Sequence, residues 1–360
     1  MRNDGLDIRE RWAAGRSLVL YGAGSVGRTL ARRLRERGIA VAAFLDAGAG
    51  PDDVREGLPV YTLAHWANAG RADGSDVIVS IHNPFVDVAP VIEALRSSGF
   101  GRVLSMVDYV SLFPDDPDER DWLVSTAYYS DKQERIDATR ALLSDDLSRT
   151  WFDATLRLRR EGNYSSLPAP RPDEQYIPAD LPRWAEPMRF IDCGAFDGDT
   201  IELMLRNGYD IEAVAAFEPD PDNYAKLVRR HADLHALFVP CGVSSTAGLT
   251  RFDGGRGTSS RIGESGETII QCVGIDDCLP SFAPTLIKMD IEGAELAALR
   301  GAERTLRRHR PGLAIALYHK PEHLWGIPLW LAECKLGYSM YLRGHLFNGY
   351  ELILYCRAPL

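Results

Sequence analysis

A short acidic segment with two glycines, IDCGAFDGDT (191–200), combines residue types that suit a ligand-binding loop. The apolar run before it predicts a buried strand that ends at Asp192, and a helix is expected to begin near Thr200. Gly194 and Gly198 would let the backbone approach a ligand without an intervening Cβ atom. A loop for pyrophosphate offers N–H groups to an anion and would avoid carboxylates. A cationic ligand rich in hydrogen-bond donors suits the three carboxylates better, and these belong to Asp192, Asp197 and Asp199.

Two further segments follow the next predicted strands, VAAFE (214–218) and ALFVP (236–240). Glu218 ends the first strand and precedes Pro219, and a carboxylate in this position can accept hydrogen bonds from both hydroxyls of a ribose. Gly242 and Val243 follow the second strand, where the adenine of such a ligand would lie. Open α/β sheets bind ligands at the carboxyl ends of their strands, so these segments and the acidic loop predict one shared site.

A fourth segment, IKMDIEGAE (287–295), joins a predicted strand to a helix and places Asp290 and Glu292 at the same edge of the sheet. The plainer interpretation of these two acids is a charge pair at the N-terminus of a helix, which the helix dipole would favour. The order and spacing of all four segments favour a ligand site over four separate structural features.

An alternation of short apolar runs with amphipathic helices predicts parallel α/β units at both ends of the chain. The fold class is therefore α/β, with two doubly wound, Rossmann-like domains. We expect an N-terminal domain over residues 1–115, a helical bridge and proline-rich strap over 116–187, and a catalytic domain over 188–360. The strands SMYLR and ELILYC, joined by a short loop (344–350), predict a final β-hairpin on the second sheet.

Four stretches resemble the FkbM family of methyltransferases: FIDCGAFDGDT, AFEPDPDNYAKL, IKMDIEGAELAALRGAE and LAIALYHKPEHLWGIPLWL, within residues 188–358. The resemblance implies a class I seven-stranded methyltransferase fold with S-adenosylmethionine as the methyl donor. It also implies that Asp192, Gly194 and Asp197 belong to the cofactor loop, that Glu218 binds the ribose, and that Asp290 and Glu292 form the family's acidic strand-end motif. The full set of expected cofactor contacts is Asp192, Gly194, Ala195, Phe196, Asp197, Gly198, Thr200, Glu218, Pro219, Gly242, Val243 and Asp290.

A histidine just past the strand LAIALY, His319, is placed where a base could reach a methyl acceptor. Methyl transfer from a sulfonium depends mainly on alignment, and a hydroxyl acceptor must also lose a proton. The unperturbed pKa of histidine lies near neutrality. We therefore predict that His319 is the general base and that Asp290 or Glu292 orients it or the acceptor.

Three residues outside the strand ends are candidates for substrate contacts. Tyr176, in the strap, would close over the cofactor or merely pack. Lys320 would bind an anionic substrate or remain a surface charge. Arg261 and Arg256 lie in a glycine- and serine-rich stretch, which we interpret as a loop beside the site, and a plain connecting loop is the alternative.

A metal centre is not predicted. His319 and His323 have the H-x-x-x-H spacing of a metal-binding pair, but a solvated or hydrogen-bonded pair is the preferred interpretation. The six cysteines form no CxxC pair and no zinc spacing.

The N-terminal segment GAGSVG (22–27) matches GxGxxG after a strand and before a helix, and Asp46 ends the next strand. This pattern leaves open a dinucleotide or nucleotide-sugar site, in which Asp46 would favour NAD over NADP. No residue pair suited to hydride transfer follows it. A structural or substrate-presenting domain is the preferred interpretation.

The net charge of −10 argues against a nucleic-acid partner, because binding to phosphate backbones needs a basic surface. We expect no signal peptide and no membrane span, and a cytoplasmic location with reduced cysteines; a homodimer is an arrangement that the sequence leaves open. The sequence predicts O-methylation of a hydroxyl on a sugar or secondary metabolite. The alternatives are N- or C-methylation of a small molecule and an NAD(P)-binding, oxidoreductase-like or bifunctional protein.

Overall fold

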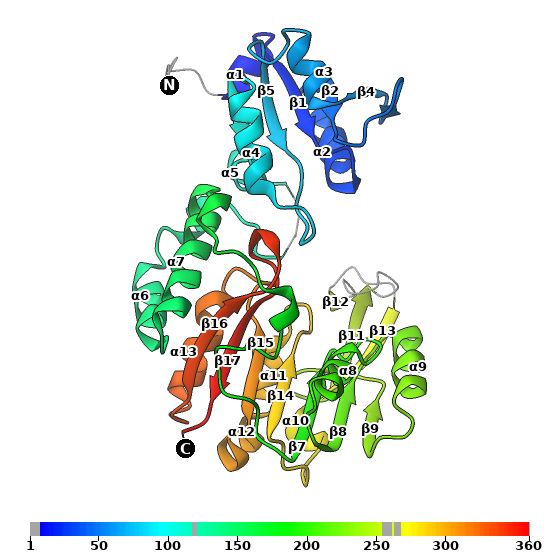
Figure 1. Ribbon diagram of the computed structural model, residues 1–360, viewed down its shortest axis with the longest axis vertical. Helices are drawn as coiled ribbons and strands as arrows, with labels where there is room; N and C mark the ends of the chain where they lie inside the picture. The colour runs from blue at the N-terminus through cyan, green and yellow to red at the C-terminus, as the bar shows by residue number, and fades with distance from the viewer. Residues whose placement is uncertain (1–7, 117–120, 254–260, 263–267, 360) are drawn as a thin grey trace.

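The computed structural model describes residues 8–116, 121–253, 261–262 and 268–359. It is elongated, with one α/β domain at each end and a helical segment beside the C-terminal sheet (Figure 1). The two sheets expected from the sequence are both present, and most of their strands are parallel. The expected α/β class with two Rossmann-like sheets is confirmed.

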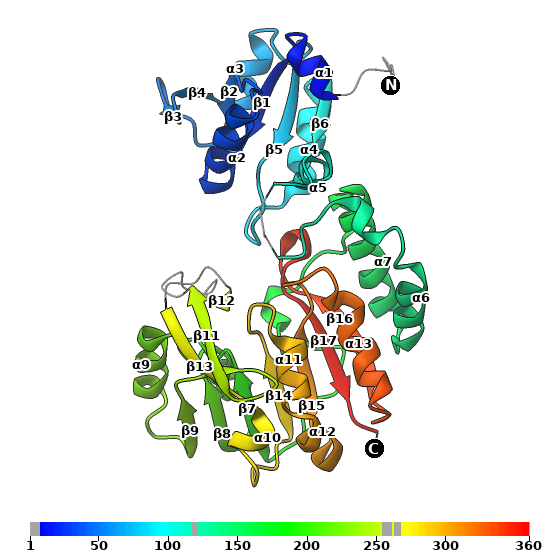
Figure 2. The same cartoon turned by 180° about the vertical axis from the view of Figure 1, so that it is seen from behind.

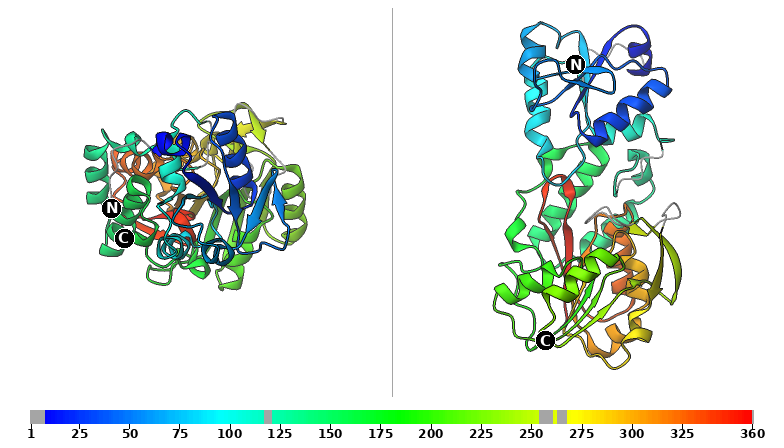
Figure 3. Two further views of the ribbon diagram at one scale, coloured as in Figure 1. Left: turned by 90° about the horizontal axis from the view of Figure 1, so that it is seen from above. Right: turned by 90° about the vertical axis from the view of Figure 1, so that its right-hand side faces the viewer.

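The N-terminal sheet has the strand order β3-β4-β2-β1-β5-β6, in which every pair except β3–β4 is parallel. Its central strands are buried, and helices cover both faces (Figure 3). The strands are β1 (Ser17–Tyr21), β2 (Ala43–Leu45), β3 (Val54–Arg55), β4 (Leu58–Tyr61), β5 (Ser75–Val79) and β6 (Arg102–Leu104). The helices are α1 (Ile8–Ala13), α2 (Ser25–Glu36), α3 (Leu63–Asn68), α4 (Val88–Ser97) and α5 (Met106–Leu112).

The C-terminal sheet has the order β16-β17-β15-β14-β7-β8-β9, and only β17 runs antiparallel to its neighbours. Strands β7, β14 and β15 are almost wholly buried, because helices cover both faces of the sheet. The strands are β7 (Met188–Cys193), β8 (Ile211–Phe217), β9 (Ala236–Val239), β14 (Leu286–Met289), β15 (Gly312–Ala316), β16 (Ser339–Gly344) and β17 (Leu352–Arg357). The helices are α8 (Asp199–Arg206), α9 (Pro221–Arg230), α10 (Ile275–Cys278), α11 (Glu295–Arg300), α12 (Glu303–His309), α13 (His323–Glu333) and the 3-10 turn η5 (Phe347–Gly349).

A helical segment between the domains packs against the outer strand β16 (Figure 2). Its main helices are α6 (Gln133–Leu142) and α7 (Asp146–Glu161), with the 3-10 turns η1 (Thr126–Tyr129), η2 (Tyr164–Ser166) and η3 (Pro172–Glu174). Arg343 of β16 is buried and pairs with Asp145 and Asp180, each at 2.6 Å. These ion pairs attach the bridge and the strap to β16, which shields an otherwise open sheet edge.

A small four-stranded sheet was not expected from the sequence. It has the order β10-β13-β11-β12 and consists of β10 (Gly242–Val243), β11 (Gly248–Asp253), β12 (Arg261–Ile262) and β13 (Thr268–Val273). The interpretation of the glycine- and serine-rich stretch as a loop is therefore wrong in part, because its first residue, Asp253, ends β11, and Arg261 and Ile262 form β12. Its residues 254–260 and 263–267, including Arg256, lie outside the described part of the chain.

Asn348 connects the two domains. Its side-chain Nδ2 donates hydrogen bonds to the carbonyl oxygens of Asn83 and Val86, at 2.8 and 2.7 Å, and its Oδ1 accepts one from the N–H of Val88 at 3.3 Å. The residue is buried and has a φ of 59°, a left-handed conformation that asparagine tolerates better than most residues. One amide thus fixes the loop before α4 to the loop between β16 and β17.

Replacing Asn348 with Ala should accelerate hydrogen exchange at the Val88 amide, because the variant removes the oxygen that accepts this N–H. Each buried group left without a partner costs about 1–3 kcal/mol. Hydrogen exchange followed by mass spectrometry measures the effect, with the exposed Asn207→Ala as control. Unchanged protection of residues 83–88 in the Asn348 variant would contradict this role.

Candidate functional site

The carboxyl ends of β7, β8, β14 and β15 meet at one edge of the C-terminal sheet. The chain leaves β7 towards β8 on one side, whereas β14 lies on the other, and such a reversal of strand order is where open α/β sheets bind ligands. The two strand ends are in close contact, since a Cβ atom on Gly194 would lie 2.0 Å from the carbonyl oxygen of Asp290. Gly194 also has a φ of 80°, so no other residue fits this turn without strain.

Glu218, at the end of β8, is held by the glycine loop. Its Oε2 accepts the N–H of Phe196 at 2.8 Å, and its Oε1 accepts the N–H of Asp220 at 2.9 Å. The residue is only 6% exposed, and burial raises the pKa of its carboxyl to about 7. Both oxygens keep a free lone pair, so the carboxylate is fixed in orientation and still able to accept hydroxyl hydrogen bonds.

Asp192 lies beneath the loop rather than on its surface. It is fully buried, and its Oδ1 lies 3.2 Å from Nζ of Lys288 on β14. The same ammonium donates a 2.6 Å hydrogen bond to the carbonyl oxygen of Gly194. Burial raises the pKa of Asp192 to about 6, against the opposing effect of Lys288. Asp192 is therefore linked to the glycine loop through Lys288, whose ammonium group also holds the carbonyl group of Gly194.

The loop carries less unbalanced negative charge than the sequence suggested. Asp197 pairs with Arg230 of α9 at 2.9 Å, and Asp192 pairs with Lys288. Two of the three loop carboxylates are therefore neutralised within the protein. The remaining predicted loop contacts occupy the turn into α8 and the turn after β8, and they are Ala195, Gly198, Thr200 and Pro219.

Gly242 and Val243 form β10, which pairs in parallel with β13 of the small sheet. Both residues are buried. They follow β9, the outermost strand of the large sheet beyond β8. The structure thus places them at the side of the site that lies beyond Glu218.

The unbalanced carboxylates gather instead around His319, just past β15. Nε2 of His319 lies 3.3 Å from Oδ1 of Asp290 and 3.4 Å from Oε2 of Glu292, while its Nδ1 lies 2.8 Å from Oε1 of Glu295. The three predicted catalytic residues are thus brought together. Glu295 also lies 3.2 Å from Nδ1 of His323, so one buried carboxylate holds both histidines of the H-x-x-x-H pair.

Tyrosines orient the neighbouring acids. The hydroxyl of Tyr176 donates to Oδ2 of Asp290 at 2.7 Å, which brings the strap directly to the site. Tyr318 donates to Glu351 at 3.0 Å, and Gln175 donates to the other oxygen of that carboxylate at 2.7 Å. Tyr176 is buried, so it packs into the site and anchors Asp290.

The charge states of this cluster follow from burial and from the neighbouring charges. Burial alone would lower the pKa of His319, but Glu295, Glu292 and Asp290 together raise it well above its usual value. Burial raises the pKa of Glu292 and of Glu351 to about 8. Burial would also raise the pKa of Glu295, but His319 and His323 hold it well below its usual value. The three acids therefore favour the protonated form of the imidazole in the unliganded protein.

Two predicted substrate contacts remain apart from this cluster. Lys320 is exposed, and its side chain runs beside Gly293, whose added Cβ would lie 2.8 Å from the Lys320 Cε atom. Arg261 belongs to β12, and its side chain lies outside the described part of the structure. The substrate-binding roles of Lys320 and Arg261 therefore remain predictions.

Four residues near the site were missed by sequence reasoning: Lys288, Glu295, Tyr318 and Glu351. A lysine within the apolar run LIKM was a usable signal, since a buried lysine requires a partner. Glu295 follows Glu292 by three residues, a helical spacing that pointed to a shared face. Glu351 gave no such signal, because it reaches the site only through the antiparallel placement of β17.

The N-terminal glycine loop has a similar local arrangement. Oδ2 of Asp46 accepts the N–H of Ala23 at 2.9 Å, as Glu218 accepts that of Phe196 in the other domain. A Cβ atom on Gly27 would lie 1.9 Å from the carbonyl oxygen of Gly22, so Gly27 allows α2 to pack tightly on its strand. A ligand for this loop stays a prediction.

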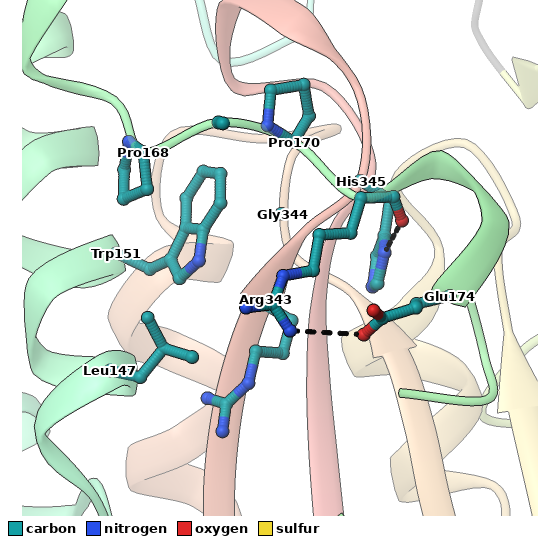
Figure 4. Close-up of a pocket in the computed structure, with 10 residues that line it drawn as sticks. Leu147, Trp151, Pro168, Pro170, Glu174, Arg343, Gly344 and His345 are labelled. Atoms are coloured by element: carbon teal, nitrogen blue, oxygen red, sulfur yellow. Dashed lines mark hydrogen bonds and ion pairs between the residues drawn. The ribbon is translucent and has the colours of Figure 1, made fainter. Parts of the chain in front are cut away.

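A separate pocket of about 260 Å³ lies between α7, the strap and the end of β16 (Figure 4). Trp151, Pro168 and Pro170 give it apolar walls, and His345 closes one side, with its Nδ1 2.7 Å from the carbonyl oxygen of Arg171. None of the predicted site residues lines this pocket. It therefore belongs to the packing of the strap rather than to the strand-end site.

A parallel seven-stranded sheet whose single antiparallel strand belongs to a terminal hairpin is the class I methyltransferase fold. Residues 192–340 match the methyltransferase FkbM domain. A crystal structure of the methyltransferase FkbM from Methylobacillus flagellatus KT is similar, with 25% sequence identity and a TM-score of 0.79, over 97% of this chain and 93% of that one. Residues 192–340 therefore carry a methyltransferase FkbM domain, as the sequence motifs suggested.

Other similarities are weaker. Fibrillarin from Aeropyrum pernix, solved with natively bound S-adenosyl-L-methionine, matches 47% of this chain and 66% of its own at 12% identity and a TM-score of 0.30, which is too low to support any conclusion. The curated proteins gave no match. None of the described helices combines the length and apolar character needed to cross a bilayer.

The Lys288–Asp192 pair should dominate the local stability of the site. Replacing Lys288 with Met leaves Asp192 buried without its cation, and breaking a buried ion pair in this way costs about 3–5 kcal/mol. Urea denaturation measures the free energy of unfolding. The matched control is Lys335→Met at an exposed position, which should change it by less than about 0.5 kcal/mol. Equal stability of the two variants would show that the pair has no such role.

Proposed function

We propose that this protein transfers a methyl group from S-adenosylmethionine to a hydroxyl of a sugar or secondary metabolite. The observation that carries the proposal is the position of Glu218, which two backbone N–H groups fix beside the glycine loop at the reversal of strand order. The acidic group around His319 lies at the same edge of the sheet, where an acceptor would meet the donor.

The residues present fit the proposed cofactor. The turn at Gly194 has no room for a Cβ atom, because the carbonyl oxygen of Asp290 lies there, so the β7 and β14 ends that would hold the cofactor pack closely together. Glu218 keeps a free lone pair on each oxygen for the two ribose hydroxyls. When bound, S-adenosylmethionine supplies a methyl group on a positively charged sulfur, and the acidic surroundings of Asp290 favour such a cation.

The residues proposed to hold the cofactor are those of the β7 and β8 turns, with β10 beside the adenine. Asp192 contributes by holding Lys288 and Gly194 in place, and Asp197 by its ion pair with Arg230. The complete proposed set is Asp192, Gly194, Ala195, Phe196, Asp197, Gly198, Thr200, Glu218, Pro219, Gly242, Val243 and Asp290.

Alignment of the acceptor is the main task of the enzyme, and well-oriented reactants gain roughly 7–11 kcal/mol in such reactions. His319, Asp290 and Glu292 are proposed to bind and activate the acceptor hydroxyl. Because Nδ1 of His319 is engaged by Glu295, Nε2 is the nitrogen that faces the acceptor. In the expected base mechanism, S-adenosylmethionine would supply the methyl group, and Nε2 would take up the hydroxyl proton. This step requires the neutral imidazole, which a nearby sulfonium cation would favour over the protonated form of the unliganded site.

Substrate recognition is proposed to involve Tyr176, Lys320 and Arg261. Tyr176 contributes by fixing Asp290, and the exposed ammonium of Lys320 lies next to the strand-end motif at Gly293. An anionic group on the acceptor would suit Lys320. The proposed acceptor is a small molecule rather than a nucleic acid. The net charge of −10 supports this choice.

The six cysteines are all unpaired in the structure. Proteins in oxidising compartments commonly carry disulfides, whereas cytosolic proteins keep their thiols reduced. This supports the proposal that the enzyme acts in the cytoplasm.

Titration calorimetry tests the cofactor proposal. The wild-type protein should bind S-adenosylmethionine in the micromolar range, and Glu218→Ala should bind it about 10- to 100-fold more weakly, because a hydrogen bond to a charged group contributes about 1.5–3 kcal/mol. Glu212→Ala, on the same strand but half-exposed and paired with Arg189, is the matched control and should bind normally. A wild-type protein that binds no S-adenosylmethionine would end the proposal.

The same titration should depend on pH. Since the pKa of Glu218 is raised to about 7, its carboxyl is charged above pH 7 and becomes neutral below it. Affinity should therefore be constant above pH 7 and fall by up to about tenfold per pH unit as the pH drops to 6. Glu218→Gln should bind weakly and show no such fall. A pH-independent wild-type affinity between pH 6 and 8 would show that Glu218 does not bind the cofactor as a carboxylate.

A further inference from the structure

Nε2 of His319 is a buried nitrogen with no hydrogen-bond partner among the described residues. The side chain is 1% exposed, so solvent does not supply a partner either. Its nearest polar neighbours are Oδ1 of Asp290 at 3.3 Å and Oε2 of Glu292 at 3.4 Å. The nitrogen thus faces two carboxylate oxygens at ion-pair distance, but neither contact is a hydrogen bond.

The other nitrogen of the ring is firmly held. Nδ1 lies 2.8 Å from Oε1 of Glu295, which also accepts the N–H of Ile291 at 2.9 Å and that of Gly293 at 3.3 Å. Glu295 is completely buried, so its position is fixed. A carboxylate that binds one ring nitrogen and thereby presents the other is the common outer support of metal-binding histidines.

The carboxylates of Asp290 and Glu292 are also placed where they could bind a further group. Tyr176 donates to Oδ2 of Asp290, while Oδ1 faces His319 and also lies 3.4 Å from the Tyr318 hydroxyl. Glu292 has a φ of 55°, an unfavourable left-handed conformation for a glutamate, and no hydrogen bond to its carboxylate is recorded within the described ranges. Residues held in such conformations concentrate at functional sites.

We propose that a divalent cation of the Mg²⁺ or Mn²⁺ type binds between Oδ1 of Asp290, Oε2 of Glu292 and Nε2 of His319. Adjacent ligands of an octahedral ion with bonds of about 2.1 Å lie about 3 Å apart, close to the two measured separations. The two carboxylate oxygens are hard donors, which favour these ions over thiophilic metals, and the single imidazole nitrogen is a borderline donor. Asp290, Glu295 and His319 also offer ligand atoms within 4.8 Å of one another, but Glu295 already serves the ring and two amides.

The proposed cation changes the role of His319. A nitrogen that coordinates a cation does not take the acceptor proton, so His319 becomes a ligand rather than the expected base. The open coordination positions would hold water or the acceptor oxygen, and a coordinated hydroxyl is more acidic and can release its proton to solvent. Only this consequence rests on the proposed methyl transfer, whereas cation binding stands without it.

Titration of the metal-free full-length protein with Mn²⁺ tests the proposal, with free Mn²⁺ followed by electron paramagnetic resonance. The wild-type protein should bind one Mn²⁺ per chain at submillimolar concentration, Mg²⁺ should displace it, and the melting temperature should rise. Glu292→Gln should weaken binding at least about tenfold, and this half-buried residue carries no structural hydrogen bond, so the variant should fold. His319→Gln should show the same loss.

The matched control is His309→Ala, at the end of α12 and on the opposite edge of the sheet, which should bind Mn²⁺ as the wild type does. No Mn²⁺ binding by the wild type, or equal affinity in Glu292→Gln, would overturn the proposal. Calorimetry with S-adenosylmethionine on the same samples separates the two ideas. Mn²⁺ binding without cofactor binding would refute the proposed function alone, and cofactor binding without Mn²⁺ binding would refute the cation site alone.

Discussion

The need to compensate buried charge governs the carboxyl edge of the seven-stranded sheet. Lys288 and Asp192 lie side by side in the core, and their ion pair also fixes the carbonyl group of Gly194. A buried ammonium or carboxylate alone would cost several kcal/mol, so each requires the other. The glycine loop therefore has a rigid base, and the orientation of Glu218 above it depends on that base.

The charges are balanced differently at the end of the neighbouring strand, β15. Asp290, Glu292, Glu295 and Glu351 approach one another around His319, and burial raises the pKa of two of these acids to about 8. The protein thus concentrates carboxyl groups where the proposed sulfonium and cation would lie, and a bound cation would favour their ionised forms. Crowding these acids destabilises the folded protein, and a cationic ligand would offset that cost. Functional sites commonly reduce stability in this way.

Much of this arrangement could be predicted from the sequence. The apolar runs SMYLR and ELILYC predicted the final hairpin of β16 and β17, and the order of the four strand-end segments brought Asp192, Glu218 and Asp290 to one edge. The neighbours of each carboxylate could not be predicted, because they depend on strand pairing. Arg230 neutralises Asp197 from α9, and Glu351 arrives from β17, so the acidic loop proved less charged and the β14 end more charged than expected.

The helical bridge and strap show the same limit. The prolines predicted an extended strap, but not that Tyr176 would reach Asp290 or that Arg343 would bind both Asp145 and Asp180. These contacts join segments more than 100 residues apart in sequence, and no local pattern encodes them. The strap thus contributes a residue to the strand-end site at Asp290, although the strap lies outside the matched family domain.

A crystal structure with the unreactive cofactor analogue sinefungin tests the central claim most directly. The account predicts that the ribose hydroxyls contact Glu218 and that the group replacing the methylated sulfur points towards Asp290 and His319. An analogue bound at Gly22–Gly27 of the N-terminal sheet, or with its ribose away from Glu218, would contradict it.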